Sequence, residues 1–212
     1  MKALIIGATG ATGKDLVNTL LSDTSYQEVV TFVRKPTGSQ HPKLKEIVTD
    51  FENLETVSHH VRGDVWFSLL GTTLKTAGSK NTQRHIDYEI PLKFAEIAKR
   101  NNVPVVVLLS AYGASSASNV FYSRIKGELE DAIVKLAFDP CIVFRPGLLV
   151  RKNTDRLGER TSAAVLNFLN RLGIFRMFRP LPTTVLAEKL AKAPKTLGPG
   201  KHVIELSKVF VF

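Results

Sequence analysis

Residues 2–16 of the chain read KALIIGATGATGKDL, and this stretch decides the fold class. An apolar run leads directly into Gly7, Gly10 and Gly13, and apolar residues then recur at helical spacing over residues 16–21. A buried strand, a glycine-rich turn and a helix follow one another, which is the context that a phosphate-binding turn requires. A plain strand–helix turn needs one glycine rather than three, so we expect a dinucleotide pyrophosphate at this turn.

The three glycines have distinct expected roles. The first permits the tight turn, the second lets the backbone approach the pyrophosphate, and the third lets the helix pack close to the strand. Backbone N–H groups of residues 9–13 then point at the phosphates, aided by the helix dipole. The residues expected to contact the cofactor here are Gly7, Thr9, Gly10, Ala11, Thr12 and Gly13.

The rest of the chain repeats the strand–helix rhythm. Continuous apolar runs predict five further strands, and helical spacing predicts helices over residues 88–101 and 121–137; the strands cover residues 28–33, 45–50, 64–70, 103–110 and 140–146. Strands that are apolar throughout are typical of a parallel sheet covered on both faces. We therefore predict an α/β fold, a Rossmann-like doubly wound parallel sheet with helices on both faces.

The rhythm changes after residue 148. Residues 160–175 and 184–194 have helical patterns, and residues 202–212 resemble a closing strand. We interpret residues 1–212 as one domain, with a dinucleotide-binding core over residues 1–148 and a short C-terminal capping segment, residues 149–212, that is not independent.

Composition excludes several classes. The chain has 212 residues and one cysteine, so an internal disulfide is impossible, and its five histidines show no metal-ligand spacing, so we expect no metal. The N-terminal apolar run is too short for a signal peptide, and the longest apolar run, residues 103–109, is far short of a membrane span. We expect a cytoplasmic protein without membrane association.

The net charge is +10. Basic proteins often bind polyanions, but the sequence has no nucleic-acid-binding motif, so we favour a solvated basic surface and consider a nucleic-acid partner unlikely. Part of the charge could instead serve an anionic cofactor. Arg34 and Lys35 directly follow the second predicted strand, where NAD-binding proteins usually place an acidic residue for the ribose hydroxyls. Two cations there favour the 2′-phosphate of NADP over NAD; the alternative is that Arg34 begins a solvated loop.

Tyr122 and Lys126 lie four residues apart and therefore on one face of the helix predicted over residues 121–137. Ser110 ends the strand that precedes this helix, at the sheet edge where doubly wound folds bind ligands. Taken singly, the tyrosine could be a packed aromatic and the lysine a solvated one. Together with Ser110 and the glycine turn, they indicate a reaction site.

These motifs resemble the short-chain dehydrogenase/reductase superfamily, whose glycine motif is similar to GATGATG and whose Y-x-x-x-K signature matches YSRIK. The closer resemblance, over residues 1–150, is to the small atypical NAD(P)-binding group that includes the HIV Tat-interacting protein, through LGTTLKTAGS, SAYGASSASNVFYSRIKGELE and RPGLL. Two positions depart from the pattern. Ala111 stands where relatives often have a second serine, and Asp87 lies near the place of an expected asparagine.

The resemblance implies a role for each residue. Tyr122 would be the general acid/base, Lys126 would bind the nicotinamide ribose and lower the pKa of the tyrosine, and Ser110 would hold the substrate carbonyl oxygen. Further cofactor contacts are implied beside the adenine, along the middle of the dinucleotide and near the nicotinamide: Asp50, Phe51, Leu70, Gly71, Thr72, Thr73, Pro146 and Leu148.

Three functions are compatible with these features. The first is an NADP-dependent oxidoreductase that acts on a small carbonyl or alcohol. The second is a weakly catalytic NADP(H) sensor that acts through a protein partner, and the third, suggested by charge alone, is an RNA- or anion-binding protein.

Overall fold

The computed structural model describes residues 1–150 and 179–212. A seven-stranded sheet, parallel throughout, forms its centre in the order β3-β2-β1-β4-β5-β6-β9. The strands are β1 (Lys2–Ile6), β2 (Glu28–Val33), β3 (Leu44–Val48), β4 (Val65–Ser68), β5 (Val105–Leu109), β6 (Cys141–Arg145) and β9 (Lys201–Glu205). The predicted doubly wound α/β fold is confirmed.

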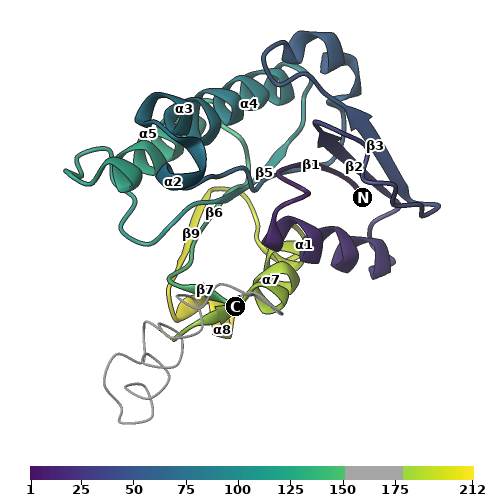
Figure 1. Cartoon of the computed structure of the whole chain (residues 1–212). Helices are drawn as coiled ribbons and strands as arrows, with labels where there is room; N and C mark the ends of the chain where they lie inside the picture. Colours follow the sequence, from purple (N-terminus) through teal and green to yellow (C-terminus); the bar gives the residue numbers. More distant parts are fainter. Residues whose placement is uncertain (151–178) are drawn as a thin grey trace.

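Helices cover both faces of this sheet (Figure 1). One face carries α4 (Ile90–Arg100), α5 (Phe121–Lys135) and the 3-10 helix η1 (Leu54–His60), and the other carries α1 (Ala11–Ser22) and α7 (Thr183–Thr196). Shorter helices are α2 (Leu74–Ala77), α3 (Lys80–Arg84), α8 (Lys208–Val211) and the π-helix η2 (His85–Glu89), which joins α3 to α4.

Two apolar cores result, one on each side of the sheet. In β1, Ala3 and Ile5 belong to the core under α1 and α7, whereas Leu4 and Ile6 belong to the core under α4 and α5. Alternate side chains of a strand point to opposite faces, so a strand covered on both sides must be apolar throughout. This explains why the strands appear in the sequence as uninterrupted apolar runs.

The C-terminal region does more than cap one end of the sheet. The strand β9 pairs in parallel with β6 and forms the sheet edge, and α7 packs beside α1. A second, two-stranded sheet joins β7 (Leu149–Val150) to β8 (Leu181–Pro182). The predicted closing strand over residues 202–212 is wrong beyond Glu205, because the chain turns there into α8. The helix predicted over 160–175 lies outside the described residues, and the boundary at residue 148 stays a prediction.

The strand order reverses direction between β1 and β4. The first three strands run outward from β1 in one direction, and β4, β5, β6 and β9 run outward in the other. The loops after β1 and β4 therefore diverge from adjacent strands and leave a crevice at the carboxyl edge, where doubly wound sheets bind ligands. Leu69 N donates to Ile6 O at 3.0 Å, so both loops begin at the same level of the sheet.

Candidate functional site

The glycine turn after β1 shows why two of its glycines are required by packing and one is not. Gly7 has a φ of +83°, and a Cβ on it would lie 2.6 Å from the Leu69 carbonyl carbon. A Cβ on Gly13 would lie 2.1 Å from the carbonyl oxygen of Gly7, since α1 crosses the end of β1 there. A Cβ on Gly10 would meet only that same oxygen, at 3.3 Å. Gly10 is therefore the glycine of this turn that its neighbours in the described residues constrain least, which agrees with the expectation that a ligand approaches its backbone.

The N-terminus of α1 is suited to a phosphate. Gly10 is its N-cap residue and makes no side-chain cap, and the first turn contains no acidic residue. The backbone N–H groups at this end have no partner within the helix, and the helix dipole favours an anion. Thr9 and Gly10 are exposed, Ala11 is half-buried, and Thr12 and Gly13 are buried. The predicted pyrophosphate contacts thus line one turn.

The loops after β2 and β3 lie on the same side of the crevice. Arg34 and Lys35 are exposed, and their side chains make no hydrogen bond or ion pair within residues 1–150 and 179–212. Asp50 is exposed and accepts from the backbone N–H of Glu52 at 3.0 Å, while Phe51 packs on the core beneath α4. The arrangement leaves two unpaired cations beside the place predicted for the adenine end.

The loop after β4, residues 69–73, is held from η2. Asp87 is fully buried, and its Oδ1 accepts from the backbone N–H of Thr72 at 2.7 Å. Gln83 Nε2 donates to the Thr72 carbonyl oxygen at 3.3 Å, and Thr73 caps α2. The wide turn of the π-helix places Asp87 inward, and single π-turns of this kind are frequent at functional sites. The loop predicted to line the middle of the cofactor is therefore fixed in place.

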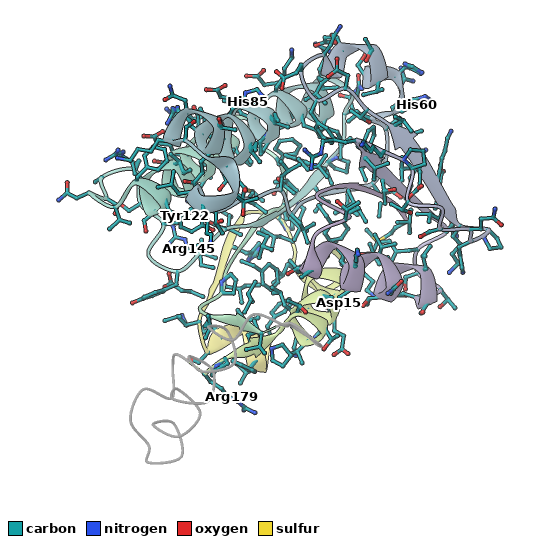
Figure 2. The ribbon with its side chains drawn as sticks, in the orientation of Figure 1. Asp15, His60, His85, Tyr122, Arg145 and Arg179 are labelled. Carbon is teal, nitrogen blue, oxygen red and sulfur yellow. The ribbon has the colours of Figure 1, made fainter. Side chains whose placement is uncertain are left out.

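Lys126 and Tyr122 meet this loop from α5. Lys126 is 3% exposed, and its Nζ donates to the Leu70 carbonyl oxygen at 3.3 Å. This Nζ lies 3.5 Å, and Asp87 Oδ1 3.8 Å, from the position of a Cβ on Gly71. Tyr122 is 39% exposed, and Lys126 Nζ lies 5.9 Å from the centre of its ring. The two residues of the Y-x-x-x-K spacing thus lie beside the loop that follows β4, and Figure 2 labels Tyr122 of this pair.

Several polar atoms at this point have no partner among the described residues. Asp87 Oδ2 is buried and unpaired. A lysine ammonium has three donors, and only the bond to Leu70 is present for Lys126. Buried polar groups in folded proteins are normally hydrogen-bonded, so these atoms point to a polar ligand. The residues fit the ribose and amide groups of a dinucleotide.

Comparison with known proteins agrees with this geometry. A family model described as NAD(P)H-binding matches residues 7–154. The protein HTATIP2 of Rattus norvegicus is 36% identical over 160 residues, which are 73% of this chain and 66% of that protein. The chain belongs to the NAD(P)H-binding family of atypical short-chain dehydrogenases/reductases.

Other relatives extend the match. Protein FMP52, mitochondrial, of Candida albicans is 34% identical to this chain over 188 residues, which are 85% of this chain and 82% of the relative. Among solved structures, a short chain dehydrogenase family protein from Francisella tularensis covers 99% of the chain and 98% of itself, with a TM-score of 0.66 and 16% identity. MoeE5, solved with UDP-glucose and NAD, covers 97% and 76%, with a TM-score of 0.74 and 15% identity. At these identities the structures share the fold.

The expectation of a cytoplasmic location is wrong by these comparisons. FMP52 proteins of Candida albicans, Eremothecium gossypii, Scheffersomyces stipitis and Debaryomyces hansenii are all named mitochondrial. Within the described parts of the chain, no helix has the length and apolar character that crossing a membrane needs. Residues 1–150 and 179–212 also contain no group of three or more His, Cys, Asp or Glu side chains that could hold a metal ion.

Ser110 differs from the role that the short-chain dehydrogenase resemblance implies. It is 6% exposed, and its hydroxyl donates to Glu130 Oε1. A serine has one proton, so this proton is not available to a substrate carbonyl while the bond is present. Pro146 and Leu148 follow β6, where the Pro146 carbonyl oxygen accepts from Tyr112 N at 3.0 Å and the Leu148 carbonyl oxygen accepts from Leu181 N at 2.9 Å.

The electrostatics of Tyr122 also differ from expectation. Burial raises the pKa of Tyr122 to about 12, and the negative charge of Asp87 contributes. Burial lowers the pKa of Lys126, while Asp87 and Glu130 oppose that shift. Burial likewise raises the pKa of Asp87, against the attraction of Lys126.

Glu130 and Arg145 are the site residues that sequence reasoning missed. Glu130 is four residues beyond Lys126, the same spacing that separates Tyr122 from Lys126. An acidic residue on the inner face of a helix, between residues that pack on the core, was the available signal.

Proposed function

We propose that this protein is an NADP-dependent oxidoreductase that transfers a hydride between the cofactor and a small carbonyl or alcohol. The observation that carries the proposal is the buried Lys126 ammonium, which has donors to spare beside Gly71 and lies one helical turn from Tyr122. Buried ionisable groups with perturbed pKa values cluster at functional sites, and burial lowers the pKa of Lys126. The NAD(P)H-binding family supports the cofactor class.

Each of these residues would have its own role in the proposed hydride transfer. The glycine turn and the N-terminus of α1 bind the pyrophosphate, and Lys126 donates to the ribose near the nicotinamide. The cofactor supplies the hydride chemistry. Tyr122 hydrogen-bonds the substrate oxygen and passes its proton to that oxygen as the alcohol forms. Because its pKa is raised above the ordinary value, Tyr122 is protonated at neutral pH and can donate to the substrate oxygen during carbonyl reduction.

Replacing Tyr122 with phenylalanine tests this role. The ring remains, and the proton is lost, so with any carbonyl found by screening aldehydes, ketones and quinones kcat should fall at least about 100-fold. The dissociation constant of NADPH should change little. Wild-type turnover by Tyr122→Phe would remove the tyrosine from the mechanism. Tyr88→Phe, in which the ring contacts Arg84, is the matched control and should retain activity.

The pH dependence follows from the same group. Alcohol oxidation requires the tyrosinate, so its kcat should rise with pH through the alkaline range, while carbonyl reduction should stay level until the tyrosine loses its proton. Stopped-flow measurement of hydride transfer in both directions checks this. Oxidation that is already level at neutral pH would contradict it, unless bound NADP⁺ lowers the tyrosine pKa, which the same titration on the binary complex measures.

The preference for NADP rests on Arg34 and Lys35. Both are exposed and unpaired within the described residues, so either can bind a 2′-phosphate without first breaking an ion pair. NADPH should therefore bind more tightly than NADH, and Arg34→Glu should erase most of the difference. Arg62→Glu makes the same charge change in the exposed loop before β4, at the opposite edge of the sheet, and should leave the preference intact. Fluorescence titration of wild type, Arg34→Glu and Arg62→Glu with NADPH and with NADH measures this preference. Equal affinities of the wild type for NADPH and NADH contradict the proposal.

A second function, an NADP(H) sensor with weak catalysis, has its own support. The proton of Ser110 is held by Glu130, and Tyr122 is not activated as a base. Tight NADPH binding without turnover of any screened carbonyl, together with a protein partner whose affinity changes between NADP⁺ and NADPH, would favour the sensor over the enzyme.

A further inference from the structure

A chain of alternating charges runs through the site and beyond it. Asp87 attracts Lys126 from η2, and Glu130 attracts it from one turn further along α5. Glu130 in turn pairs with Arg145 at the end of β6, and Arg145 Nη1 lies 3.5 Å from Glu205 Oε1 at the end of β9. Figure 2 shows Arg145 on the same side of the molecule as Tyr122. Five charges from four elements therefore alternate in sign.

Glu130 is the member of this chain that is held most firmly. It is 1% exposed. Arg145 binds it through two nitrogens, with Nη2 to Oε2 at 2.6 Å and Nε to Oε1 at 3.0 Å, and Ser110 donates to Oε1. A bidentate arginine and a buried hydroxyl fix both the position of a carboxylate and its negative charge. Removal of a single partner from such a buried pair would be costly.

The surroundings of Lys126 indicate that Glu130 does more than pack in the core: its carboxylate is a counter-charge for the buried ammonium. The groups beside the Lys126 ammonium are the Leu70 carbonyl after β4, the Tyr122 ring and the Asp87 carboxylate from η2. The Glu130 carboxylate comes from four residues further along α5, one helical turn away, with Arg145 bound to it. An ammonium with almost no exposure to water is stable only when nearby negative charges replace its hydration. Asp87 also binds the loop at Thr72, so Glu130 is the second of two counter-charges.

We propose that Glu130, fixed by Arg145 and Ser110, is a positioning residue that keeps Lys126 charged and in place to bind the cofactor. In this arrangement the Ser110 hydroxyl donates its hydrogen bond to the Glu130 carboxylate. Only its lone pairs are then available to a ligand. A ligand group that lies against Ser110 must then be a hydrogen-bond donor, such as a hydroxyl or an amide N–H. The inference rests on the proposed role of Lys126 as a cofactor ligand.

The first test needs no cofactor. In protein labelled with ¹³C-lysine, the Cε resonance that is missing from Lys126→Met identifies Lys126, and its titration is followed by NMR. Glu130→Gln removes a negative charge and should move the midpoint to lower pH. Arg145→Gln leaves the Glu130 charge uncompensated and should move the midpoint to higher pH. A role in packing alone does not produce opposite shifts.

The matched control is Glu128→Gln. Glu128 lies two residues from Glu130 on α5, but it pairs with Arg84 and is 28% exposed, so the Lys126 midpoint should not move. An unchanged midpoint in Glu130→Gln, or shifts of the same sign in Glu130→Gln and Arg145→Gln, overturns the proposal. If Glu130→Gln does not fold, the upward shift in Arg145→Gln still decides.

The second test uses NADPH as the probe. Between about pH 6 and pH 9, Glu130→Gln should lose affinity with rising pH earlier than wild type, by about tenfold at the alkaline end, because an opposite charge at short range typically changes a protonation equilibrium by at least that factor. A parallel loss at every pH overturns the proposal. Absence of NADPH binding by the wild type contradicts the proposed function, whereas the NMR titration reports on Glu130 in either case.

Discussion

At the residue scale, the glycine turn separates the demands of the fold from those of the ligand. Gly7 and Gly13 have no room for a side chain, since each would press on backbone atoms less than 3 Å away. A Cβ on Gly10 would meet one backbone oxygen at 3.3 Å, a tight contact that a small shift relieves, and the Gly10 φ of −69° suits any residue. The fold therefore requires two of these glycines, and the third is the one that we expect cofactor binding to require.

Gly10→Val and Gly13→Ala should consequently fail in different ways. We expect Gly10→Val to fold, with its melting temperature near that of wild type, and to bind NADPH at least about tenfold more weakly, about 1.4 kcal/mol, because the branched side chain occupies the path of the pyrophosphate. Gly13→Ala should lose about 1–3 kcal/mol of unfolding free energy from overpacking. Circular dichroism melts and fluorescence titration measure both. Normal NADPH binding by Gly10→Val would place the phosphates elsewhere.

At the scale of elements, the pairing of α1 with α7 joins the two ends of the chain. Tyr26, just beyond α1, is fully buried, and its hydroxyl donates to the Ala191 carbonyl oxygen of α7 at 2.8 Å. Lys195 of α7 pairs with Asp23, which lowers the pKa of that carboxyl. The helix that begins at the glycine turn therefore packs against a helix from the C-terminal region, so residues 183–196 help to hold α1 in place.

Tyr26→Phe should weaken this pairing. The change leaves a buried carbonyl without its donor, so the free energy of unfolding should fall by about 1–2 kcal/mol in urea titrations. The control is Tyr88→Phe, whose hydroxyl has no hydrogen bond within the described residues, and it should stay within about 0.5 kcal/mol of wild type. Equal stability of the two variants would show that the Tyr26 bond contributes nothing.

At the scale of the whole molecule, loops from both halves of the sheet meet at its carboxyl edge, around the switch point between β1 and β4. The phosphate turn follows β1, the predicted 2′-phosphate contacts follow β2, the loop held by Asp87 follows β4, and Lys126 comes from α5. A ligand that contacts all four bridges elements on both faces and on both sides of the switch point. Binding should therefore stabilise the folded chain as a unit.

NADPH should raise the melting temperature of the whole protein. At a free concentration of about 100 times the dissociation constant, binding to the folded state alone adds about 2.7 kcal/mol. Scanning calorimetry with NADPH, NADH and no ligand measures the effect, and NADPH should give the largest shift. Gly10→Val should show no shift at the same concentration. A shift in that variant equal to wild type would mean that the stabilising site lies outside the glycine turn.

Much of the fold followed from local patterns. Strands buried on both faces must be apolar at every position, and GATGATG must lie between a strand and a helix to bind phosphate, so both could be found from neighbouring residues. The i, i+4 spacing of Tyr122 and Lys126 needed only the geometry of one helix. The position of the switch point between β1 and β4 was not predicted, because right-handed βαβ connections alone do not determine the strand order.

Other features depend on contacts between residues far apart in the chain. The strand β9 enters the sheet beside β6 through pairs about 60 residues apart, such as Cys141 with Lys201, which no local pattern encodes. The direction of the Ser110 hydrogen bond likewise depends on a contact between different elements of the tertiary structure. A serine can donate to a ligand or to a neighbour. Ser110 donates to Glu130, which Arg145 holds, because the three side chains converge from the end of β5, from α5 and from β6. The sequence by itself determined which chemical groups are present, and the tertiary structure decided which of their protons and charges are already paired.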